Sequence, residues 1–88
     1  MSSVPYLRVH PSDTVAVAVS ALASGTHVTI DDLSITLAEP IAQGHKFSLK
    51  AIRAGEPVIK YGAPIGEAKS DIAIGMHVHD TNIRTLLQ

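Results

Sequence analysis

One short pattern recurs along the chain: an apolar residue, two others, a glycine, two others and a second apolar residue. Each copy predicts an apolar anchor, a reversal in which glycine permits positive φ, and the start of a new strand. The anchors at 22, 41, 52 and 72 are 19, 11 and 20 residues apart, which is too irregular for a solenoid. The pattern therefore favours a compact all-β fold of many short strands with sharp corners. Its four copies are Leu22-Gly25-Val28, Ile41-Gly44-Phe47, Ile52-Gly55-Val58 and Ile72-Gly75-Val78.

Alternation of apolar and polar residues predicts where the strands lie. Residues 14–20 read TVAVAVS; a helix capped by Ser12 is the alternative, but three valines in five residues favour a strand. Asp31-Asp32 separates two alternating runs and predicts a hairpin. The run GAPIG at 62–66 predicts a corner between strands. The other strands are expected at 6–10, 26–30, 33–37, 46–52, 57–61, 67–72, 76–79 and 82–87.

Composition limits both the core and the class of partner. The 88 residues predict a single domain, 1–88, with a thin core. Aromatic residues make up only 3% of the chain, so the core must be aliphatic and no platform exists for stacking bases. The absence of cysteine excludes disulfides and thiolate sites, which leaves a partner, oligomerisation or a metal held by His and carboxylates to supplement the core.

Charge and hydropathy argue against two further classes of partner. A net charge of -1 gives no support for binding to nucleic acid or to an anionic membrane. No apolar run approaches the roughly 20 residues that a membrane span needs. The first residues, MSSVP, lack the charged start and apolar core of a signal peptide, so a cytoplasmic location is the default expectation.

His77-Val78-His79 is the sharpest local signal for chemistry. Residues two apart on a strand point to the same face, so the two imidazoles could share a metal while Val78 faces the core. A third ligand would have to come from elsewhere, with His10, His45 and Asp80 as candidates. The alternative is that both histidines simply occupy a polar strand face.

Two other short runs combine cationic and polar side chains. His45 and Lys46 follow the flexible Gly44 and would suit a carboxylate or phosphate ligand, although an ordinary exposed turn is the alternative. Lys60 and Tyr61 offer a cation and a phenol, or a snorkelling lysine and a half-buried tyrosine. The sequence contains no glycine-rich phosphate loop and no nucleophile elbow. We therefore expect no self-sufficient enzyme.

Six stretches together carry a resemblance to a known family: LRVHP at 7–11, DTVAVA at 13–18, GHK at 44–46, IRAGEPVIKYG at 52–62, PIG at 64–66 and parts of 71–82. They resemble the SAF domain of the altronate/galactarate dehydratase (UxaA) family. The resemblance implies a β-clip fold that accompanies a much larger catalytic dehydratase part, either fused or as a separate subunit. That part removes water from a sugar-acid substrate with the help of a divalent metal, usually iron; no cofactor is assigned to this chain, and a homo-oligomer is allowed. A related sulfolactate sulfo-lyase eliminates sulfite and also has a small SAF subunit.

The same resemblance suggests which side chains meet a substrate. The family often has His-x-His-Asn near the end of this domain; this chain has Thr81 in place of the second histidine, and His77 where an aromatic residue is common. A Lys or His from such a domain would stabilise the enolate-like charge of a dehydration. The alternatives are a pure interaction module, with an assembly or carbohydrate-binding role, and a stand-alone metal-binding protein. The expected substrate-binding residues are His45, Lys46, Lys60, Tyr61 and Asn82, the expected metal ligands are His77 and His79, and no catalytic residue is assigned.

Overall fold

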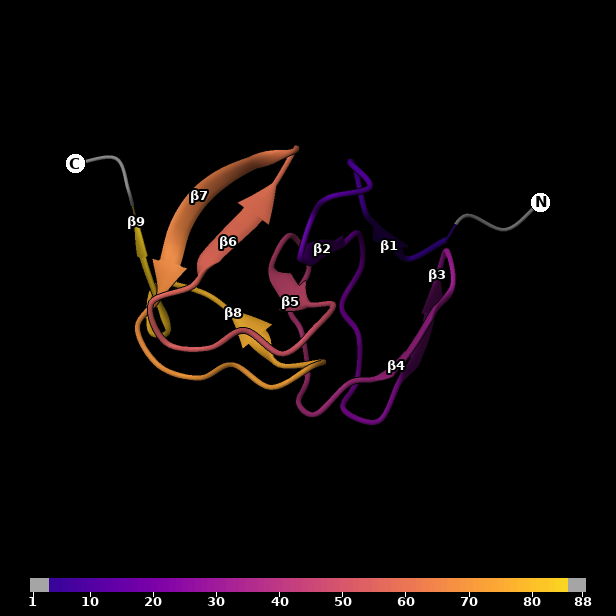
Figure 1. Ribbon diagram of the computed structural model, residues 1–88. Helices are drawn as coiled ribbons and strands as arrows, with labels where there is room; N and C mark the ends of the chain where they lie inside the picture. The colour runs from indigo at the N-terminus through magenta and orange to yellow at the C-terminus, as the bar shows by residue number, and fades with distance from the viewer. Residues whose placement is uncertain (1–3, 86–88) are drawn as a thin grey trace.

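The computed structural model describes residues 4–85, and the regular structure in that range is entirely β. The strands form three small antiparallel sheets, with the orders β1-β2-β5-β8, β3-β4 and β6-β7-β9 (Figure 1). The expected all-β, SAF-like (β-clip) fold is confirmed. Residues 4–85 contain no helix that is long and apolar enough to cross a membrane. The strands are β1 (Tyr6–Leu7), β2 (Val15–Ala18), β3 (His27–Ile30), β4 (Leu33–Thr36), β5 (Lys46–Ser48), β6 (Pro57–Lys60), β7 (Ala63–Ala68), β8 (His77–Val78) and β9 (Ile83–Thr85).

The four-stranded sheet separates two apolar cores. The β3–β4 hairpin lies on one side of β2 and β5, and the β6-β7-β9 sheet lies on the other (Figure 1). Phe47 is the only aromatic residue buried in either core; the other members are aliphatic, as expected. The first core contains Ala16, Ala18, Leu22, Val28, Ile30, Ile35, Leu37, Ile41, Phe47 and Leu49, and the second contains Val15, Ile52, Val58, Ala68, Ile72, Val78 and Ile83.

The repeated glycine pattern is the turn device that the sequence predicts. All four glycines have positive φ, between 80° and 87°. The residue three positions after each glycine is fully buried in a core. The anchors pair with one another across antiparallel bridges, Leu22 with Ile41 and Ile52 with Ile72. Each copy therefore reverses the chain, and the pairing of the anchors joins the first reversal to the second and the third to the fourth.

Most of the predicted strands are confirmed, although they are shorter than expected. The TVAVAVS run is strand β2, so the helical alternative is wrong. Asp31-Asp32 forms the two-residue turn of the β3–β4 hairpin, in which Ile30 pairs with Leu33. The strand expected at 6–10 ends at Leu7, because a turn closes from Asp13 N–H to the carbonyl of His10. The strand expected at 82–87 is β9, and the last two positions of that range lie outside the described residues.

The corner predicted at 62–66 is wrong, because β7 runs through it. The reversal occurs one position earlier, where Tyr61 and Gly62 have φ values of 57° and 76°, as a primed two-residue hairpin turn requires. Pro64 is accommodated beside a register irregularity at Val58/Ile59 in the partner strand. Gly66 lies inside the strand, where an added Cβ would be 2.4 Å from the carbonyl oxygen of Arg84. Glycine here permits the close approach of β9.

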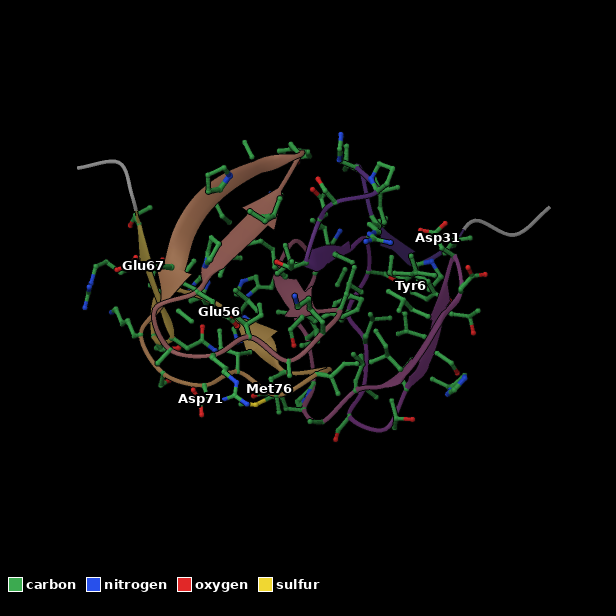
Figure 2. The ribbon with its side chains drawn as sticks, in the orientation of Figure 1. Tyr6, Asp31, Glu56, Glu67, Asp71 and Met76 are labelled. Atoms are coloured by element: carbon green, nitrogen blue, oxygen red, sulfur yellow. The ribbon has the colours of Figure 1, made fainter. Side chains whose placement is uncertain are left out.

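Hydrogen bonds from side chains to the backbone stabilise both ends of the fold. The hydroxyl of Tyr6, which lies between β1 and β3 (Figure 2), bonds to both the N–H and the carbonyl of Thr29, at 3.1 and 3.2 Å. At the other end, the carboxylates of Glu56 and Asp71 accept the N–H groups of Arg53 and Ala54, at 2.7 and 2.9 Å. These two acidic residues therefore support a turn.

Candidate functional site

Three histidines from two segments of the chain lie close together beside the four-stranded sheet. His45 follows the Gly44 turn, His77 lies in β8 and His79 follows that strand. The antiparallel pairing of β5 with β8, in which Phe47 is opposite His77, brings the two segments together. The ring centroids are 4.8 to 5.2 Å apart and the ring planes are within 17° of parallel. We call His45, His77 and His79 the imidazole cluster.

Each imidazole of the cluster offers a nitrogen to the same small volume. One ligating nitrogen from each ring lies within 4.8 Å of the other two. His45 Nδ1 and His77 Nε2 are 2.8 Å apart and share a hydrogen bond. Of the three candidates for a third metal ligand, the structure thus brings His45 to His77 and His79. His10 instead bonds to the Ser12 hydroxyl and lies against Gly62.

The backbone between the two neighbouring histidines is held at both ends. Val78 is fully buried, so His77 and His79 share the opposite face, as predicted. The Asn82 side chain accepts the N–H of His79 at 2.9 Å and donates to the carbonyl of His77 at 2.7 Å. The Glu39 carboxylate accepts the N–H of His77 at 3.1 Å. Asn82 therefore positions the cluster, and its contact with a substrate stays a prediction.

Glu39 is a member of the site that the sequence does not reveal. It lies 38 residues before His77 and approaches it through the hydrogen bond between Ala38 N–H and the carbonyl of Gly75. This long-range pairing of two loops brings them together, and no local sequence pattern around Glu39 indicates it.

Burial and neighbouring charge favour the neutral form of His77. Burial lowers the pKa of His77, and the charges that His45 and His79 carry when protonated lower it further. Glu39 acts in the opposite direction and Lys46 adds a smaller lowering effect on the same pKa. Neutral imidazoles carry a free nitrogen lone pair, which both metal binding and acceptance of a proton require.

Lys46, Lys60 and Tyr61 form a second group, which we call the lysine group. Burial lowers the pKa of Lys46, and the nearby Lys60 lowers it further, whereas Asp80 and Tyr61 raise it. Lys60 Nζ lies 4.6 Å from the centroid of the Tyr61 ring. Tyr61 is 60% exposed at the tip of the β6–β7 hairpin, so its ring faces solvent and is not half-buried.

The two groups lie on opposite faces of one ladder. Residues that pair directly across antiparallel strands share a face. Lys46 pairs with Val78, which belongs to the second core, and Phe47 pairs with His77 on the side of the first core. The structure therefore brings the three histidines together and brings Lys46 near Lys60, but it divides the expected substrate surface in two.

The two main surface hollows of residues 4–85 do not contain either group. Two surface hollows of about 330 and 160 Å³ are present. The first is lined by Lys69, Asp80 and residues 83–85, and the second by Thr14, Lys50 and parts of 52–59, so neither includes a histidine of the cluster. The three histidines, Lys46 and Lys60 are each half-buried, and Tyr61 is exposed.

Comparison with known proteins identifies the family. The family model of the altronate/galactarate dehydratase SAF domain matches residues 4–86. Altronate dehydratase of Escherichia coli (strain K12) is 52% identical over 82 residues, which are 93% of this chain and 17% of that protein. Altronate dehydratase of Bacillus subtilis (strain 168) is 35% identical over 82 residues, which are 93% of this chain and 16% of that protein.

A shorter relative also matches. The (2R)-sulfolactate sulfo-lyase subunit alpha of Paracoccus pantotrophus is 44% identical over 54 residues, which are 61% of this chain and 81% of that subunit. The chain thus spans about a sixth of the two altronate dehydratases and most of the sulfo-lyase subunit. Because the family model covers nearly every residue, the chain belongs to the altronate/galactarate dehydratase SAF domain family.

Proposed function

We propose that this chain is the SAF part of a sugar-acid hydro-lyase and that it completes or covers the active site of a larger catalytic part. The observation that carries the proposal is the concentration of basic groups along the β5–β8 ladder in a chain of net charge -1. Three imidazoles lie on one face of the ladder, and Lys46 near Lys60 on the other. A sugar acid presents a carboxylate, for which such groups are suitable partners.

The chemistry of dehydration explains why these groups are useful. Dehydration takes a proton from the α carbon, which develops enolate-like charge on the carboxylate, and then breaks the C–O bond at the β carbon, so that the hydroxyl leaves as water and a C=C bond forms. Lys46 is suited to stabilise this charge or to donate a proton, because its lowered pKa eases proton release. In the proposal, a divalent metal, iron, is held by the larger part and supplies Lewis-acid chemistry there.

The length of the related proteins and the exposure of the two groups both indicate a larger catalytic part. The related altronate dehydratases are about six times longer than the matched segment. The side chains of both groups keep some exposure to solvent, and a reaction that develops charge gains from the exclusion of water by a second surface. We therefore propose that the lysine group closes over a substrate that is bound mainly by the catalytic part, while the imidazole cluster lies on the other face of the ladder.

The test measures dehydration of altronate and galactarate by this chain alone, by the catalytic part alone and by both together. We expect no turnover from this chain alone and full turnover from the assembled enzyme. Lys46→Ala should lower the turnover of the assembled enzyme by about 100-fold, the effect of losing one group that stabilises the transition state. Lys50→Ala, an exposed lysine of the neighbouring turn, is the matched control and should leave turnover unchanged. Full activity from this chain alone would refute the proposal.

A sulfo-lyase subunit is the second candidate, favoured by one observation. The chain is 44% identical to a sulfo-lyase subunit alpha and covers 81% of it, so a short free-standing SAF chain has a precedent. Release of sulfite from (2R)-sulfolactate by the assembled enzyme, without dehydration of altronate or galactarate, would favour this function. Unchanged activity after His45→Ala, Lys46→Ala and His79→Ala would instead indicate a pure interaction module.

A further inference from the structure

The imidazole cluster has the donor set of a metal site that belongs to this chain itself. Tetrahedral coordination with metal–nitrogen bonds of about 2.0–2.1 Å separates the ligand nitrogens by about 3.3 Å. In the cluster, one nitrogen from each ring already lies within 4.8 Å of the others, and one pair is at 2.8 Å. Coordination of one ion by all three nitrogens therefore requires rotation of these partly exposed side chains out of their stacked arrangement.

From this arrangement we infer that His45, His77 and His79 bind one divalent transition-metal ion, such as Zn²⁺, Co²⁺ or Fe²⁺, and leave a coordination position open. Three imidazoles select these ions over Mg²⁺ and Ca²⁺, which prefer oxygen ligands. The open position can accept water or an oxygen of a carboxylate. This inference goes beyond the proposed function and does not depend on it, because the site consists of side chains of this chain alone.

The surroundings of the cluster support pre-organisation of the ligands. His77 and His79 are held relative to each other by the two hydrogen bonds of Asn82 and by the burial of Val78 between them. Glu39 holds the N–H of His77 from the other side. His45 is fixed by the Gly44 turn, in which its own N–H bonds to the carbonyl of Ala42. Backbone contacts of this kind orient ligands before the metal arrives, which lowers the entropic cost of binding.

The alternative to a metal site is a merely structural contact, in which His45 and His77 share a hydrogen bond. A structural pair needs only these two rings and a shared proton, and His79 contributes to it by ring stacking alone. A metal replaces that proton and requires a nitrogen from all three rings. Removal of the His79 imidazole therefore separates the two roles, because it leaves the His45–His77 hydrogen bond in place.

The experiment titrates the untagged chain with Zn²⁺ by calorimetry and with Co²⁺ by visible absorption. We expect one ion per chain, a Co²⁺ spectrum typical of nitrogen ligands and about 100-fold weaker binding in His79→Ala. His27→Ala is the matched control: this exposed histidine of β3 bonds to the Ser34 hydroxyl and should leave affinity unchanged. His45→Gln changes a loop side chain outside the cores and provides a second variant if His79→Ala fails to fold.

Three results would overturn the inference: binding no tighter than about 1 mM, equal losses in His27→Ala and His79→Ala, or unchanged affinity in His79→Ala or in a folded His45→Gln. The readout is binding by this chain without a catalytic part. A failed metal titration therefore leaves the proposed hydro-lyase function standing, and an inactive assembled enzyme leaves the metal site standing.

Discussion

The carboxylate of Asp13 accepts a hydrogen bond from the backbone N–H of Gly62, 2.8 Å away and 49 residues along the chain. Asp13 is only 2% exposed, and its other oxygen accepts the N–H of His10 at 3.0 Å. This contact joins the turn between β1 and β2 to the tip of the β6–β7 hairpin. It stabilises the reversal at Tyr61, a residue that seldom adopts positive φ, and so helps to position the lysine group.

Asp13→Ala should destabilise the fold strongly. It leaves the N–H groups of His10 and Gly62 without their acceptor, and hydrogen bonds to a charged group each contribute about 1.5–3 kcal/mol. We expect the free energy of unfolding in urea to fall by about 2–3 kcal/mol. Asp32→Ala, in the exposed β3–β4 turn, is the control and should change that free energy by less than about 0.5 kcal/mol. Equal effects of the two substitutions would contradict the assigned role.

The same carboxylate predicts how stability depends on acid. Burial alone would raise the pKa of Asp13, but hydrogen bonds from the N–H groups of Gly62, His10 and Tyr61, with the charge of His10, hold it below its ordinary value. A folded-state pKa below the unfolded one stabilises the protein above the unfolded pKa, and this contribution disappears as pH falls through the folded pKa. Between about pH 5 and pH 2, the urea midpoint of the wild type should therefore fall more steeply than that of Asp13→Asn. Parallel profiles would show that Asp13 has no such role.

Local sequence patterns are sufficient to predict those structural features that neighbouring residues determine. The four apolar-x-x-Gly-x-x-apolar copies predict reversals because only glycine adopts φ near 80° without strain, and all four reversals are present. His77 and His79 share a face because the period of a strand is two. In both cases the residues that determine the outcome lie within a few positions of one another.

The parts that the sequence does not reveal depend on contacts between distant segments. His45 joins the imidazole cluster only through the pairing of β5 with β8, and the sequence leaves it as one of three candidates. The Tyr61–Gly62 reversal is missed because tyrosine is an unusual residue for a primed turn, and its acceptor, Asp13, comes from another part of the chain. Lys46 is separated from the histidines by strand register, which side-chain chemistry alone does not specify.

Two equivalent glycines should respond differently to alanine. Gly55 and Gly75 occupy the same position in the turn device, with φ of 87° and 80°. A Cβ at Gly55 meets nothing within 4 Å, whereas one at Gly75 would lie 2.6 Å from the carbonyl oxygen of Thr36. Gly55→Ala should cost about 1–2 kcal/mol from backbone strain alone, and Gly75→Ala about 1–3 kcal/mol more from the clash. Chemical denaturation of both variants measures the difference, and similar losses would show that the Gly75 loop relaxes freely.

Asn82→Ala should loosen the segment that carries two members of the imidazole cluster. The substitution removes the acceptor for the N–H of His79 and the donor to the carbonyl of His77, so we expect a loss of about 1–2 kcal/mol in the free energy of unfolding. The amide proton of His79 should exchange with solvent faster, which hydrogen-exchange NMR measures residue by residue. Thr81→Ala, at an exposed neighbouring position, is the control and should leave this exchange rate unchanged.

Asn82→Ala also separates positioning from direct ligation in the proposed metal site. Because Asn82 orients the backbone of the ligands and offers no nitrogen lone pair of its own, its loss should weaken Zn²⁺ binding by about 10-fold, typical of a supporting residue. His79→Ala should weaken binding by about 100-fold under the same conditions. Asn82→Asp keeps the acceptor for the N–H of His79 and should recover the slow exchange of that amide. If Asn82→Asp exchanged as fast as Asn82→Ala, the hydrogen bond to His79 would not be what holds this segment in place.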